Sequence, residues 1–267
     1  MTTTTERLKV HRRSLRLDGL EYTILSPRPS VDVRFATNRF HDTWHVVSDV
    51  AGARLLARLC WAMAFQQRER TIVLIDMPLL VPNPFDADPS APILISNNDL
   101  GPLGRDAVSA LRATLPLATP SMGTVVLQTR GLDAALDDPD AFHRRDDQAS
   151  WRDQHQQRRW IDGSDGLVVM AAPPPVLRQW GVEFSNLGQP KYDGMDWSYL
   201  DYPDKSGEVH VIDDFASHVE AAVALRNRLF PDQGETLLTQ EERIRVWSLR
   251  RDDPSTAGHQ ASGFEWS

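Results

Sequence analysis

Residues 71–76 read Thr-Ile-Val-Leu-Ile-Asp, a short apolar and β-branched run that ends on a carboxylate. Apolar residues at successive positions are typical of a strand covered on both faces, as in a parallel sheet between helices. The same form recurs at 92–95, 123–127 and 167–170, and helix-like segments precede the last two. This alternation predicts an α/β fold with a mixed, mainly parallel central sheet flanked by helices, in a Rossmann-like three-layer arrangement.

A long helix is predicted over residues 49–70, directly before this strand. Its middle, 55–65, is apolar on nearly every face, so we expect it to lie deep against the sheet. The only cysteine, Cys60, falls within it and is predicted to be a packed core group, because apolar surroundings raise a thiol pKa and suppress its reactivity. One cysteine also excludes an intrachain disulfide and a cysteine-based zinc site.

The chain begins with β structure. Asp18-Gly19 separates two strand-like runs, and such a dipeptide favours a tight antiparallel β-hairpin. Thr239 and Glu242 have capping-box spacing ahead of a final helix. We expect a disordered N-terminus over 1–6, a single α/β domain over 7–250, and a flexible C-terminal tail over 251–267.

The composition argues against two classes of partner. The net charge is −8, whereas nucleic acid and anionic membranes both attract a positive surface. No run of about 18 apolar residues, the length that spans a bilayer, occurs, and the first residues lack the apolar stretch of a signal peptide. A cytoplasmic protein without membrane contact is therefore expected.

Candidate functional residues lie at the strand ends. In open parallel sheets, ligands bind outside the carboxyl ends of the strands, where loops converge. Carboxylates suit acid-base chemistry, while amides and a guanidinium orient polar or anionic groups. We predict Asp76 and Asp99 as catalytic residues, Asp76 being a general base or metal ligand. The predicted ligand-binding residues are Asn97, Asn98, Arg130 and Asp213. Asp and Asn also begin turns and cap helices, so this alternative stays open for each residue.

His41, His45 and Asp49 are spaced four residues apart, which is a possible metal-ligand pattern. On a helix this spacing would align two imidazoles and a carboxylate. Trp44, Val46 and Val47 favour an extended segment instead, and Asp49 suits a helix cap. No metal site is predicted here, and the sequence leaves the cofactor unknown.

Three common catalytic motifs do not occur: the dinucleotide fingerprint, the P-loop and the Gly-x-Ser-x-Gly elbow. Our hypothesis is a ligand-binding protein, either a hydrolase or a transferase, acting on a nucleotide-like or other polar metabolite. The alternative is a non-catalytic interaction or assembly component, favoured by eight tryptophans and by long connections at 77–91 and 182–207. The partner is thus a polar small molecule or a protein, including a second copy of the chain.

Overall fold

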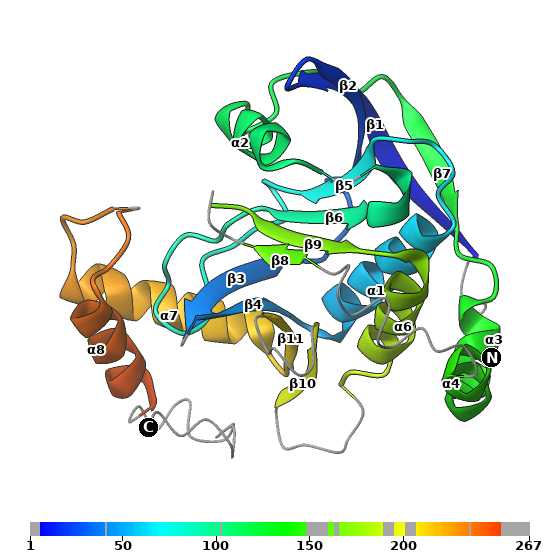
Figure 1. The fold of residues 1–267 in the computed structure, drawn as a ribbon. Helices are drawn as coiled ribbons and strands as arrows, with labels where there is room; N and C mark the ends of the chain where they lie inside the picture. The colour runs from blue at the N-terminus through cyan, green and yellow to red at the C-terminus, as the bar shows by residue number, and fades with distance from the viewer. Residues whose placement is uncertain are drawn as a thin grey trace.

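A computed structural model of the chain has a mixed α/β fold with two β-sheets (Figure 1). The residues that the structure describes are 6–40, 42–101, 103–147, 160–162, 166–188, 195–200, 207–234 and 236–251. Most of the predicted N-terminal segment and C-terminal tail lies outside these ranges. Among the residues described, no helix is both long and apolar enough to span a bilayer.

The large sheet has mostly antiparallel neighbours. Its strand order is β7 (Thr124–Gln128), β1 (Arg7–Leu17), β2 (Leu20–Pro27), β5 (Thr71–Ile75), β6 (Ile93–Asn97), β9 (Val168–Ala172) and β8 (Trp160–Asp162). Within this described sheet only β2–β5 and β6–β9 are parallel pairs. The predicted mainly parallel sheet is therefore wrong, and these strand directions do not support a Rossmann-like arrangement.

The physical reason lies in the connections. Burial on both faces produces an apolar run in a strand of either direction, so the run itself does not reveal whether its neighbour is parallel. β5 and β6 are joined by 76–92, which contains no helix in the structure, and they pair antiparallel. A parallel pair would need a crossover, usually a helix.

The first two strands are joined by a tight turn. Asp18 and Gly19 both have positive φ, 46° and 74°, as a two-residue turn between twisted strands requires. β1 and β2 then pair antiparallel, with Leu17 opposite Leu20.

A second, smaller sheet was not predicted. Its order is β10 (Met195–Tyr199), β11 (Gly207–Ile212), β4 (Thr43–Ser48) and β3 (Phe35–Phe40). β11 and β4 run parallel, and the outer pairs are antiparallel. Strands from opposite ends of the chain therefore lie side by side at the centre of this sheet.

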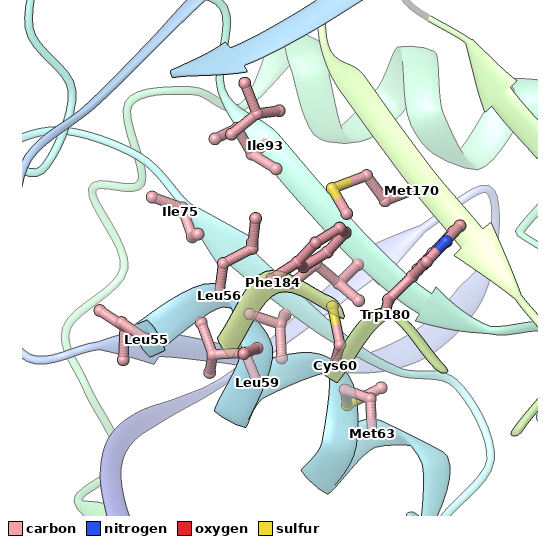
Figure 2. Close-up of a cluster of buried hydrophobic side chains, with 14 of the residues drawn as sticks. Leu55, Leu56, Leu59, Cys60, Met63, Ile75, Ile93, Met170, Trp180 and Phe184 are labelled. Carbon is pink, nitrogen blue, oxygen red and sulfur yellow. The ribbon is translucent and has the colours of Figure 1, made fainter. Parts of the chain in front are cut away.

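Helices α1 (Val50–Ala64) and α6 (Pro174–Ser185) pack in a core that includes side chains from both sheets. Leu56 and Leu59 of α1 are fully buried there, and Trp180 of α6 is almost completely buried (Figure 2). Cys60 is fully buried, as predicted, and burial raises its thiol pKa.

The outer faces of both sheets are covered by other helices. α2 (Arg105–Ala113) packs on the opposite face of the large sheet, and α7 (Phe215–Leu229) packs on the outer face of the small one. α8 (Gln240–Arg251) packs on α7 (Figure 1) and begins at the predicted capping box, where the Thr239 N–H donates to Glu242 Oε2 at 2.8 Å. α3 (Leu132–Asp137), α4 (Pro139–Asp147) and the short 3-10 helix η1 (Asn98–Leu100) complete the described helices.

The long proline-bearing connection 77–91 is fastened to α7 and α8 by a buried carboxylate. Asp88 Oδ1 lies 2.5 Å from Arg226 Nη1, and Asp88 Oδ2 lies 2.7 Å from Arg243 Nε. The Leu238 N–H also donates to Asp88, at 3.0 Å. A buried carboxylate with three such partners holds this loop against the small-sheet side of the protein.

Candidate metal centre

Three potential metal ligands converge on the outer face of the small sheet. Glu208 of β11 is the register partner of His45 on the parallel strand β4. His210 follows Glu208 by two residues and therefore points to the same face of the sheet. One ligand atom from each of the three side chains lies within 4.8 Å of the other two.

The Glu208 carboxylate links the two imidazoles. Its Oε2 lies 2.7 Å from His210 Nε2 and 3.7 Å from His45 Nε2. The two imidazole centroids are 4.9 Å apart, with the rings inclined at 72°. The side chains of His45 and His210 are only 4% and 1% exposed, and that of Glu208 is 14% exposed, so the strands hold the cluster largely away from water.

The local electrostatics favour a neutral His45. Burial, and to a lesser extent the neighbouring His210, lower the pKa of His45 to about 4, although the Glu208 carboxylate acts in the opposite direction. At neutral pH its imidazole is therefore uncharged. A neutral imidazole keeps the nitrogen lone pair that metal coordination uses.

An aromatic side chain stands beside the cluster. Trp197 of β10 is the register partner of His210, and the two rings are stacked with centroids 6.5 Å apart. Trp197 is 40% exposed. On the same face, Tyr199 is opposite Glu208 and Asn38 of β3 is opposite His45. The partly exposed Trp197 thus lies between the buried imidazole of His210 and solvent.

Two imidazoles and one carboxylate form the donor set of catalytic zinc sites and of non-haem iron sites. Donors bound at about 2.1 Å to one ion lie roughly 3.0–3.4 Å apart. The widest separation in this cluster is at most 4.8 Å, so it would close by up to roughly 1.4–1.8 Å on metal binding. With three protein ligands, a fourth coordination position would stay available for water or a substrate atom.

The sequence-predicted residues do not come together in one crevice. Asp76 follows β5, whereas Asn97 ends the antiparallel neighbour β6, and Ser96 is opposite Ile72. Because the strands run antiparallel, the two residues lie at opposite edges of the sheet, about 16 Å apart for five residues at roughly 3.3 Å per residue. Asn97 has a structural role: its Nδ2 donates to the Met63 carbonyl at 3.1 Å, and its Oδ1 accepts the Asp99 N–H at 3.0 Å.

The other predicted residues are dispersed. Asn98 and Asp99 lie in η1 beside Asn97. Arg130 follows the edge strand β7, and its exposed guanidinium lies 3.7 Å from the carboxylate of Glu6. Asp213 is exposed in the turn between β11 and α7, on the small sheet. Their catalytic and ligand-binding roles stay predictions, but the six residues do not share one site.

The helical arrangement of His41, His45 and Asp49 does not occur. His45 lies in β4, and Asp49 caps α1 by accepting the Gly52 N–H at 2.7 Å, while His41 lies outside the described residues. Sequence reasoning missed the pairing of His45 with Glu208 and His210. The available signal was the spacing of Glu208 and His210, which places two potential ligands on one face of a predicted strand.

No protein-family model matches this sequence, no curated protein shows significant similarity to it, and no solved structure shows such similarity either.

Proposed function

We propose that the chain is a metal-dependent hydrolase in which His45, Glu208 and His210 bind one divalent transition-metal ion. The observation that carries the proposal is the convergence of three ligand atoms within 4.8 Å on two adjacent strands. Strand positions are fixed by backbone hydrogen bonds, and a site built on them is more precisely held than one on loops. The two imidazole donors favour zinc or ferrous iron over magnesium or calcium, which prefer oxygen ligands.

Hydrolysis suits this donor set for a chemical reason. A three-ligand site leaves room for a bound water, and a zinc ion lowers the pKa of such a water to about 7, which supplies hydroxide at neutral pH. The same ion can polarise a carbonyl or phosphoryl oxygen. The substrate class we propose is a polar metabolite carrying such a group, with Trp197 forming one wall of its approach to the ion.

Metal binding is tested by thermal unfolding of the chelator-treated full chain with added Zn²⁺ or Mg²⁺. We expect Zn²⁺ to raise the midpoint temperature and Mg²⁺ to leave it unchanged. The stabilisation by Zn²⁺ should be lost in His210→Ala and in Glu208→Gln, which changes the side-chain shape less. It should be retained in His143→Ala, which lies outside the cluster. A zinc response that persists in both cluster variants, or that is absent from the wild type, contradicts the proposal.

The catalytic part is tested separately with a panel of carboxylic and phosphoric esters. We expect hydrolysis of at least one ester that stops on chelation and returns with Zn²⁺, and that Glu208→Gln abolishes. Zinc binding without any hydrolysis across the panel would retain the metal centre and remove the hydrolase assignment. In that case the non-catalytic interaction or assembly role would be the better proposal.

A further inference from the structure

A cavity lies at the carboxyl ends of β2 and β5, on the large sheet. These two strands are parallel neighbours, so their ends meet at one edge of the sheet, where ligands bind in open α/β folds. The cavity's empty volume of ≈ 490 Å³ includes open solvent at its mouth, so the space enclosed by the protein suits only a small ligand. Its polar lining consists of His11, Arg13, Ser26 and Asp76.

These four side chains share one face of the sheet. Leu17, Ile24 and Leu74 belong to the buried cluster that α2 covers. His11 and Arg13 lie an even number of residues from Leu17, Ser26 lies two from Ile24, and Asp76 lies two from Leu74. Because side chains alternate along a strand, each polar group points to the same face as its apolar counterpart. The polar lining therefore comes from β1, from β2 and from the residue that follows β5.

The cavity contains two side chains of opposite charge, Arg13 and Asp76, that do not form an ion pair with each other. Arg13 is oriented by two bonds, from Nε to the Thr119 carbonyl at 2.9 Å and from Nη1 to Ser26 Oγ at 3.5 Å. Asp76 follows β5, which lies two strands away from β1 in the sheet. Among the ion pairs of the described residues, none joins Arg13 to Asp76. A ligand that carries both charges would pair with each of them.

We infer that this cavity binds a small zwitterion of the α-amino acid class. Asp76 accepts hydrogen bonds from the ammonium group, and Arg13 pairs with the carboxylate, an interaction that its planar guanidinium suits. Pro78, Pro116 and Leu117 also line the cavity and give apolar contacts to a short aliphatic side chain. This site is on the large sheet and is independent of the proposed metal centre.

Calorimetric titration of the chelator-treated full chain tests the inference, with glycine, L-alanine, L-valine and L-proline as probes. Acetate and methylammonium each carry one of the two charges and serve as comparison ligands. We expect at least one amino acid to bind, and both single-charge ions to bind at least about tenfold more weakly. Binding of acetate or methylammonium as tightly as the amino acids, or no binding of any amino acid, overturns the inference.

The variants separate the two charges. Asp76→Asn and Arg13→Gln should each weaken amino-acid binding by roughly tenfold or more, because each removes one charge-assisted contact. The controls Asp32→Asn and Arg16→Gln remove exposed charges outside the cavity and should leave the affinity unchanged. Circular dichroism checks that each variant is folded. Ser26→Ala removes one of the two hydrogen bonds of Arg13, and we expect it to cause a smaller loss of amino-acid affinity. Unchanged affinity in both Asp76→Asn and Arg13→Gln would contradict the assignment.

Discussion

The two sheets differ in what their buried strands contain. In the large sheet, β5 and β9 are buried and carry apolar side chains at every position except Thr71. In the small sheet, β4 and β11 hold His45 and His210 buried within the strands, with Glu208 between them. Burying polar groups costs free energy unless they are paired. The interior of the large sheet therefore consists mainly of apolar side chains that stabilise the fold. The small sheet buries side chains that are potential metal ligands.

The largest effect is expected from a substitution that removes packing between the two sheets. Trp180 is 1% exposed, and its Nε1 donates to the Leu200 carbonyl at 3.0 Å. Trp180→Ala should lower the free energy of unfolding by about 3–5 kcal/mol, since it leaves a large cavity and removes the hydrogen bond to the Leu200 carbonyl. Urea unfolding measures the change. Leu20→Ala, an exposed matched position, should cost less than about 1 kcal/mol; equal losses would show that α6 does not join the two sheets in one core.

The next effect concerns the polar anchor of the small-sheet side. Asp88→Asn removes the charge that pairs with Arg226 and Arg243 and leaves the buried Arg226 without its carboxylate partner. We expect a loss of about 3 kcal/mol in unfolding free energy, as for other buried pairs that lose one member. Urea unfolding measures the loss, with Asp232→Asn at an exposed position as control. A loss under about 1 kcal/mol would show that Asp88 does not fasten the 77–91 connection.

A smaller effect is expected inside the proposed metal centre. In the metal-free chain, Glu208→Gln weakens the 2.7 Å interaction with His210. We expect this substitution to lower the free energy of unfolding by about 1–2 kcal/mol. Glu220→Gln, on an exposed position of α7, should change it by less than about 0.5 kcal/mol. If Glu208→Gln instead stabilises the metal-free chain, the Glu208 carboxylate lowers the stability of the fold. The small sheet would then differ from the large sheet even more.

The smallest effect depends on pH. Burial, together with the nearby Asp88 charge, raises the pKa of the Asp86 carboxyl above its usual value. Its contribution to stability is therefore present below the unfolded-state pKa and is lost as the pH rises through the folded-state pKa. The Asp86→Asn variant has no carboxyl to ionise, so it does not lose stability in this way. Its amide oxygen can still accept hydrogen bonds from Asn83 Nδ2 and the Asp88 N–H. We expect the variant to gain stability relative to the wild type between pH 4 and pH 7, as followed by thermal unfolding; a relative loss over this range would contradict the raised pKa.

Local patterns predicted local features well. The apolar run at 71–75 forms β5, the apolar helix buries Cys60, and Thr239 with Glu242 begins α8. Strand direction could not be predicted, because apolar runs contain no directional information and the connection at 76–92 was not recognised as a loop between antiparallel strands. For the same reason, the strand ends that carry Asp76 and Asn97 were expected to converge, and they do not.

The candidate metal centre depends on contacts between distant parts of the sequence. His45 meets Glu208 only because β4 and β11 pair in parallel, in a sheet with α1 packed on one face and α7 on the other. No local spacing joins the two segments. Glu208 and His210 were visible as a strand pattern, but their ligand role becomes apparent only when His45 is placed opposite them.

The most direct test of the contrast between the sheets is the zinc content of the full chain after equilibrium dialysis, measured by mass spectrometry. We predict about one zinc ion per wild-type chain, and less than a tenth of that in His45→Ala and His210→Ala. His11→Ala, which removes the cavity histidine of the large sheet, should retain the wild-type zinc content. Wild-type chain without zinc, or equal zinc content in all variants, would contradict the proposal that the small sheet holds a metal centre.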